Sequence, residues 1–175
     1  GSSASACQGR PVRLFSALLL PRNALDALES WYPQVLAERP GTRRVRRENL
    51  HLSLRFFGEF PPEDARRILD DAWSSYGALP LEFRLTKTGC FNDTAVWVGG
   101  SFSPGVYGLA EAAGNRSFLP HVTIARLSGG HPPALPPVPA GISGLLDGMT
   151  LFESTLTPRG PLYSVVFRWV PGGLP

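Results

Sequence analysis

Residues 50–57 read Leu-His-Leu-Ser-Leu-Arg-Phe-Phe, and this alternation of apolar and polar side chains decides the fold. Successive side chains of a β-strand point to opposite faces of the sheet, so the three leucines share one face. His51 and Ser53 then share the other face, roughly 6.5 to 7 Å apart. The stretch predicts a half-buried strand that presents an imidazole and a hydroxyl side by side.

A second tetrapeptide, His121-Val122-Thr123-Ile124, repeats the order imidazole, apolar, hydroxyl, apolar. A hydroxyl can donate to a phosphate oxygen, and an imidazole can carry a proton near neutral pH. Two such pairs on facing walls of a cleft would bracket one phosphorus atom, with one imidazole neutral and the other protonated. The pattern alone leaves open whether these are catalytic residues or two unrelated histidines with satisfied hydrogen bonds. It also leaves open which imidazole would be the acid.

The composition is that of a globular domain with many turns. Of 175 residues, 43% are hydrophobic and 18% are charged, which gives enough apolar material for a core and argues against disorder. The formal charge of +3 permits an anionic ligand, and two cysteines are too few for a disulfide framework or a cysteine-built metal site. The length predicts a single domain over residues 10–175, after a disordered tail or cloning remnant at residues 1–9.

Expected strands and helices alternate along the chain, with several turns too short for parallel crossovers. This favours an α+β fold with antiparallel sheets. A Pro-rich stretch at residues 129–139 is expected to be a surface loop. The expected strands lie near residues 12–20, 43–47, 50–57, 81–88, 94–98, 121–127, 148–155 and 163–170, and the expected helices begin near Asn23, Pro61 and Val106.

Four stretches resemble the two-histidine phosphoesterases, in particular the RNA 2′,3′-cyclic phosphodiesterase branch, historically called 2′-5′ RNA ligases. They are RLFSALLLP from residue 13, RRENLHLSLRFFGE from residue 46, FLPHVTIARL from residue 118 and MTLFESTLTPRGPLYSVVFRW from residue 149. Together they follow the family's order over nearly the whole chain. The resemblance implies a bilobal fold of two pseudo-symmetric lobes, each with a mainly antiparallel sheet and flanking helices, and an active-site groove between them.

The resemblance also implies an activity and a set of roles. It implies metal-independent hydrolysis of RNA 2′,3′-cyclic phosphate ends to 2′-phosphomonoesters, with reversible 2′-5′ ligation in some members and no cofactor. His51 would be the proton donor to the departing 3′ oxygen and His121 the proton acceptor that activates water. Ser53 and Thr123 would bind the phosphate oxygens. Ser53 stands where threonine is commoner in the family, which keeps the hydroxyl.

Three further residues are expected at the substrate. Arg126 matches a family arginine near the phosphate or base, although strict alternation points it away from His121, so a bend or β-bulge is required there. Arg55 is in step with His51 and would face the groove. Phe15 resembles a family aromatic that stacks on the nucleobase, and core packing is the alternative.

A run of arginines precedes the first motif. It could guide RNA phosphates toward the cleft, or it could be a solvated edge strand protected by charge. The run comprises Arg39, Arg43, Arg44, Arg46 and Arg47.

The expected partner is RNA with 2′,3′-cyclic phosphate or 2′-phosphate ends, and the protein is expected to be a cytoplasmic monomer without a membrane segment or a metal. No P-loop motif supports an ATP-consuming ligase. Two other functions stay open: the same chemistry on a small nucleotide such as an ADP-ribose cyclic phosphate, and a non-catalytic RNA-binding module. A metal hydrolase is disfavoured because clustered histidines and carboxylates are scarce.

Overall fold

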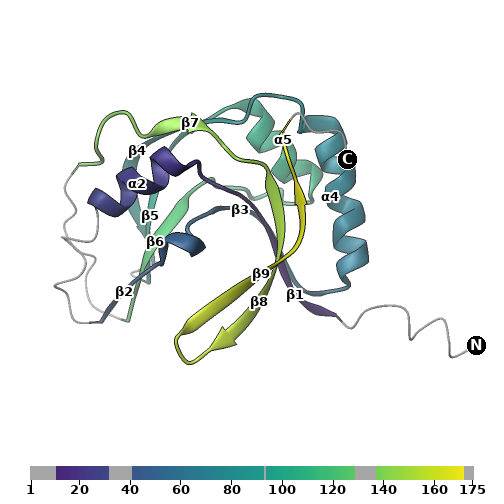
Figure 1. The fold of residues 1–175 in the computed structure, drawn as a ribbon, viewed down its shortest axis with the longest axis horizontal. Helices are drawn as coiled ribbons and strands as arrows, with labels where there is room; N and C mark the ends of the chain where they lie inside the picture. Colours follow the sequence, from purple (N-terminus) through teal and green to yellow (C-terminus); the bar gives the residue numbers. More distant parts are fainter. Residues whose placement is uncertain (1–10, 32–40, 93, 129–136, 172–175) are drawn as a thin grey trace, which may run out of the picture.

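The computed structural model describes residues 11–31, 41–92, 94–128 and 137–171. The expected tail, Arg39 and most of the Pro-rich stretch lie outside these residues. Within them the strands form one curled antiparallel sheet in the order β7-β4-β5-β6-β3-β1-β8-β9, with β2 beside β6 (Figure 1). The elements are β1 (Val12–Leu18), α2 (Arg22–Trp31), β2 (Thr42–Arg44), the 3₁₀ turn η1 (Arg47–Asn49), β3 (Leu52–Phe60), α4 (Pro62–Tyr76), β4 (Glu82–Phe91), β5 (Ala95–Phe102), α5 (Pro104–Ala112), β6 (Val122–Leu127), β7 (Ser143–Leu145), β8 (Met149–Thr157) and β9 (Gly160–Trp169).

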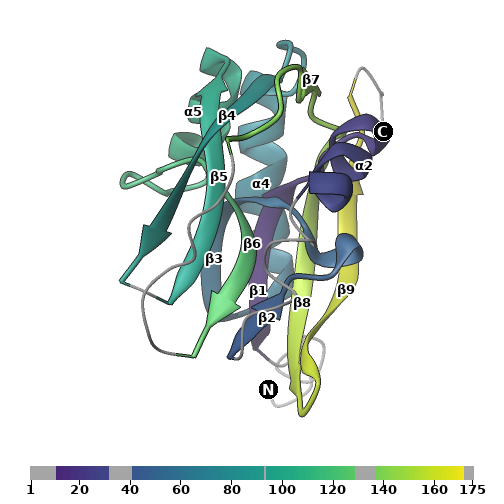
Figure 2. The ribbon, with the colours of Figure 1, turned by 90° about the vertical axis from the view of Figure 1, so that its left-hand side faces the viewer.

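The sheet consists of two halves that meet between the two histidine motifs. Strand β3 pairs with β6 at Leu52 and Val122, and this is the point where the halves join. Beyond it lie β1, β8 and β9 on the side of β3, and β5, β4 and β7 on the side of β6. Figure 2 shows these halves on either side of the β3–β6 contact. The α+β fold with two mainly antiparallel lobes is confirmed, and the two lobes share one continuous sheet.

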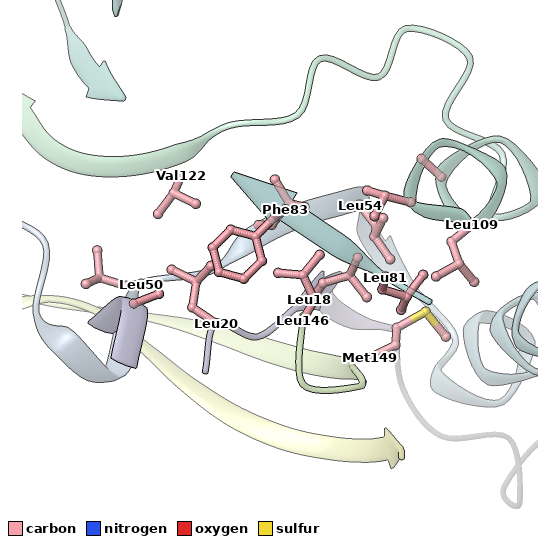
Figure 3. Close-up of a cluster of buried hydrophobic side chains, with 14 of the residues drawn as sticks. Leu18, Leu20, Leu50, Leu54, Leu81, Phe83, Leu109, Val122, Leu146 and Met149 are labelled. Atoms are coloured by element: carbon pink, nitrogen blue, oxygen red, sulfur yellow. The ribbon is translucent and has the colours of Figure 1, made fainter. Parts of the chain in front are cut away.

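The apolar face of β3 lies in the main core, as its alternation predicts. Leu50, Leu52 and Leu54 have exposed fractions of 3%, 0% and 0%. Figure 3 shows leucines from β1, β3 and α5 gathered in this cluster. Helices α4 and α5 lie side by side on the outer face of the sheet (Figure 1). They can approach closely because a Cβ at Gly108 of α5 would overlap the ring of Tyr76 of α4.

Two local expectations differ from the structure. Helix α2 begins at Arg22, so Asn23 is not its N-cap. Instead the Asn23 amide donates to the Ser143 carbonyl at 3.1 Å and ties α2 to β7, a short strand that the sequence analysis did not predict. The arginine-rich strand is also shorter than expected: β2 ends at Arg44, and η1 begins three residues later at Arg47.

The turn η1 is anchored to α2 by charge. Arg47 Nη1 lies 2.7 Å from Asp26 Oδ1 and 3.0 Å from Glu29 Oε2, and these two hydrogen bonds raise the pKa of Arg47. The anchor fixes the segment that leads into His51. Of the helices that the structure describes, none has the length and hydropathy needed to cross a bilayer.

Candidate active site

A groove of about 700 Å³ runs over the inner face of the sheet where its halves meet. Both histidine motifs face it, together with β2, the segment after β2 and the turn between β8 and β9. Its walls carry five arginines and no carboxylate among the described residues. The lining residues are Arg43, Arg44, Val45, Arg46, Asn49, His51, Ser53, Phe56, Phe91, Thr94, Ala95, His121, Thr123, Arg126, Thr157, Arg159, Gly160, Pro161, Leu162 and Tyr163.

The His51 imidazole is held at both ring nitrogens. Its Nδ1 lies 2.6 Å from the Asn49 carbonyl oxygen, so Nδ1 carries a proton and donates it. Its Nε2 lies 2.8 Å from Ser53 Oγ, and in the neutral ring this nitrogen accepts a hydrogen bond from the hydroxyl. The backbone carbonyl therefore fixes the tautomer and directs Nε2 toward the groove.

His121 has the same backbone anchor at Nδ1 in the other half of the molecule. Its Nδ1 lies 2.6 Å from the Leu119 carbonyl oxygen, again two residues before the histidine. Nδ1 is the donor here too, and Nε2 is the nitrogen available to a ligand. The duplicated sequence motif thus has a duplicated anchor, which the sequence analysis did not predict.

The register of the two strands brings the four motif side chains together. Because Leu52 is opposite Val122 in an antiparallel pair, His51 is opposite Thr123 and Ser53 is opposite His121. Residues opposite each other have Cβ atoms about 5 Å apart, and residues two apart on one strand are about 6.6 Å apart. The imidazoles therefore stand at opposite corners of a small rectangle, with a hydroxyl at each of the other corners.

Both strands leave regular alternation directly after the motif. Strand β6 has an irregularity opposite Val96 and Trp97. This is the bulge that the expectation for Arg126 required, and Arg126 lines the groove. Strand β3 has a matching irregularity opposite Ser16 and Ala17. It brings Phe56 to the groove, five residues after its histidine, just as Arg126 is five residues after His121.

The irregularity in β3 makes the expectation for Arg55 wrong. Its guanidinium donates to the Ala113 carbonyl at the end of α5, at 2.7 Å, and stacks on the Phe57 ring at 4.3 Å from the centroid. Arg55 therefore packs against the helices on the outer face. Regular alternation would have kept it beside Ser53.

The expectation that Phe15 offers a face to a nucleobase is also wrong, because its ring is only 2% exposed. Phe15 lies under the groove in contact with His51, with ring centroids 5.1 Å apart, and Tyr163 covers it from β9. Phe56, by contrast, is 73% exposed within the groove lining.

Aromatic rings that the sequence analysis missed support both imidazoles. Tyr163 meets the His51 ring edge-on at 5.6 Å, and Phe91 meets the His121 ring edge-on at 4.8 Å. Trp97 lies behind Phe91, where the absence of a side chain at Gly89 leaves room for its ring. These residues come from distant strands, and only their aromatic character at strand ends could have drawn attention to them.

The groove favours a neutral His51 in the free protein. The pKa of His51 is lowered to about 4, mainly by burial and to a smaller extent by the proximity of His121 and Arg126, against the raising effect of the Asn49 carbonyl. Burial also raises the pKa of Tyr163, so its hydroxyl stays protonated. At neutral pH the charge of the walls comes from the arginines, and the groove is suited to an anion.

No group of three or more histidines, cysteines or carboxylates close enough to hold a metal ion occurs among the described residues. Thr123 and Ser53 offer hydroxyl donors and the imidazoles offer proton carriers. This set of groups fits an enzyme that binds a phosphate ester and moves protons with paired imidazoles.

Comparisons with known proteins agree with this class. The family model described as LigT-like phosphoesterase matches residues 18–97. An RNA 2′,3′-cyclic phosphodiesterase of Thermus thermophilus is 32% identical, over 90% of this chain and 89% of its own length. LigT of E. coli, solved in complex with ATP, superimposes with a TM-score of 0.78 at 26% identity over 93% of this chain and 98% of LigT. A solved protein of Thermus thermophilus gives a TM-score of 0.76 at 29% identity over 92% of this chain and 98% of its own.

The chain belongs to the LigT-like phosphoesterase family. The match to the Thermus relative extends over nearly the full length of both proteins, and the solved structures share the arrangement of both halves.

Proposed function

We propose that this protein is an RNA 2′,3′-cyclic phosphodiesterase that hydrolyses the cyclic phosphate to a 2′-phosphomonoester without a metal ion. The observation that carries the proposal is the pair of imidazoles, each anchored through Nδ1 and each flanked by a hydroxyl, in one positively charged groove. Three relatives of this chain, from Thermus, Methanocaldococcus and Thermotoga, bear the name RNA 2′,3′-cyclic phosphodiesterase.

The reaction is an in-line displacement at phosphorus. A water oxygen forms a bond to phosphorus as His121 takes the water proton. The bond from phosphorus to the 3′ oxygen breaks, and His51 donates a proton to that oxygen, which leaves as a 3′ hydroxyl. Ser53 and Thr123 donate hydrogen bonds to the non-bridging oxygens. Each positioned acid or base contributes about 10² to 10⁴ to the rate.

His51 must be protonated to act as the acid, although its low pKa leaves it neutral in the free protein at neutral pH. A bound phosphate supplies the missing stabilisation in two ways. Its negative charge favours the imidazolium ion, and its oxygens draw the Ser53 hydroxyl away from Nε2. Substrate binding and protonation of His51 are thereby coupled.

Nucleobase contact is assigned to Phe56 in place of Phe15. Its exposed ring lies on the same side of the groove as His51 and Ser53, and an exposed aromatic face can stack on any base. Arg126 lines the groove from the opposite strand, and in this proposal its guanidinium contacts the phosphate.

The test is product analysis on an oligonucleotide ending in a 2′,3′-cyclic phosphate, in ¹⁸O-labelled water and with a chelator present. The expected product is a 2′-phosphomonoester carrying one ¹⁸O atom, formed at the same rate with and without the chelator. His51→Ala and His121→Ala should each lower kcat at least about 100-fold. A 3′-phosphate product, loss of activity in chelator, or full activity in both variants would contradict the proposal. Reverse 2′-5′ ligation, the monomeric state and the cytoplasmic location stay predictions.

A further inference from the structure

The groove extends well past the two histidines along a row of arginines. Arg43 and Arg44 come from β2, Arg46 from the segment before η1, and Arg159 from the turn between β8 and β9. All four are exposed. The ion pairs found in the described part of the chain involve other arginines, such as Arg47, and none of these four.

The row starts beside the second histidine motif and runs away from it along β2. The Val45 amide donates to the Ile124 carbonyl at 2.9 Å, so Arg46 is the member of the row nearest to that motif. Arg43 is opposite Arg126 in the pairing of β2 with β6, and Arg126 is five residues beyond His121. At about 3.3 Å per residue, Arg43 begins roughly 15 Å along the strand from His121. Together with Arg126 the row provides more cations than a single reacting phosphate can occupy, so some of them are open to other charges of a bound molecule.

The two walls that carry the row come close together at this end of the groove. Asn49 Nδ2 donates to the Pro161 carbonyl at 3.4 Å. Arg43 Nη1 lies 3.8 Å from the position that a Cβ would take at Gly160, next to Arg159. A ligand in this part of the groove meets guanidinium groups from both walls.

Several separate cations along a groove fit a ligand with repeated negative charges. In an RNA that ends in a 2′,3′-cyclic phosphate, the rest of the chain extends only in the 5′ direction from the reacting end. Its backbone phosphates are repeated charges of this kind. A cyclic mononucleotide has no phosphate that could reach the row.

We propose that Arg43, Arg46 and Arg159 form a subsite for the backbone phosphates of the nucleotides immediately 5′ of the cyclic phosphate. This inference rests on the proposed function and names its substrate class: the end of an RNA strand rather than a cyclic mononucleotide. The subsite makes kcat/KM higher for a tetranucleotide with a cyclic phosphate end than for the matching cyclic mononucleotide.

The test compares these two substrates in the wild type, in the triple variant Arg43→Ala/Arg46→Ala/Arg159→Ala and in a matched control. The control, Arg22→Ala/Arg84→Ala/Arg116→Ala, removes the same charge from exposed arginines outside the groove lining. The wild type should prefer the tetranucleotide at least tenfold in kcat/KM. The groove variant should lose most of this preference, and the control should keep it.

Binding gives an independent readout that does not require turnover. Anisotropy with a labelled tetranucleotide bearing a 2′-phosphate end, measured from 50 to 300 mM KCl, gives the slope of log K against log salt. Three phosphate contacts to a single strand correspond to a slope change of about 2. The groove variant should show a slope shallower by about that amount, and the control should match the wild type.

Equal kcat/KM on both substrates in the wild type would overturn the inference. So would an unchanged salt slope in the groove variant, or equal losses on both substrates. If the wild type turns over neither substrate, the proposed function fails, and the salt slope alone still decides whether the subsite exists.

Discussion

The protonation of His51 should be directly measurable, because burial separates its pKa in the folded protein from that in the unfolded chain. The folded value is about 4, and an imidazole in an unfolded chain has a pKa of about 6.5. Between these values the unfolded state binds a proton that the folded state does not. The free energy of unfolding therefore rises with pH through this window.

The size of the effect follows from the difference of about 2.5 pKa units. At about 1.4 kcal/mol per pKa unit, His51 changes the free energy of unfolding by about 3 kcal/mol over the whole window. Lowering the pH from 7 to 5 reduces the free energy of unfolding by about 2 kcal/mol through this group. Above about pH 6.5 the ring is neutral in both states, so its protonation no longer lowers the free energy of unfolding. The groups that face His51 are His121, Arg126 and Tyr163, and the first two lower the pKa of His51 in the same direction as burial.

The assay is urea unfolding at pH 7 and pH 5 for the wild type and for His51→Gln, which cannot titrate. Between the two pH values the wild type should lose about 2 kcal/mol more than the variant. Two-dimensional NMR of the imidazole nitrogens should give a midpoint for His51 near pH 4 in the free protein. The midpoint should be higher with adenosine 2′-monophosphate bound, because the phosphate stabilises the imidazolium ion. Equal losses in the two proteins, or a midpoint near 6.5 in the free protein, would refute the reasoning.

Other changes test the site and the core. Ser53→Ala should lower kcat on a cyclic phosphate substrate by about tenfold or more, because a hydrogen-bond donor to the phosphate is lost. Ser53→Thr should retain activity, and equal effects of the two substitutions would show that the hydroxyl has no part in the mechanism. Phe56→Ala should raise KM at least about fivefold through lost stacking, with Phe56→Tyr as the control that keeps KM; an unchanged KM in the alanine variant would place the base elsewhere. Leu52→Ala should lower the free energy of unfolding by about 2 to 5 kcal/mol in urea, because its side chain is fully buried where the sheet halves join; a loss below 1 kcal/mol would contradict the described core.

The features of the fold that depend on the local alternation of apolar and polar residues could be predicted from the sequence. The leucines around His51 are buried in the core, and both histidine motifs lie at the centre of the sheet, because apolar side chains must take the buried face of a strand. It did not predict the aromatic surroundings of the imidazoles. Phe91 and Tyr163 reach the groove from strands whose pairing depends on the whole sheet, so no local pattern marks them.

The predicted positions of Arg55 and Phe15 were wrong because they also depend on contacts with strands that are distant in the sequence. A β-bulge depends on the register with a neighbouring strand, so the composition of β3 does not reveal it. Arg126 was expected in the groove only with a bulge after His121, whereas Arg55 was expected there on strict alternation after His51. The structure has an irregularity in both strands. Phe15 does lie on the groove side, but Tyr163 from the far end of the chain covers it.

The duplication also explains why the two imidazoles can take different roles. Each histidine has a backbone carbonyl at Nδ1 and a hydroxyl residue two positions later, so the motif by itself does not decide which one is the acid and which the base. The bulges break this equivalence, because the position five residues after the histidine is the aromatic Phe56 in one half and the cation Arg126 in the other. A nucleotide that stacks on Phe56 and directs its phosphate toward Arg126 can bind in only one orientation. In the proposed mechanism that orientation would present the 3′ ester oxygen to His51 and the attacking water to His121, so the roles of the two histidines would follow from the asymmetry of the groove walls.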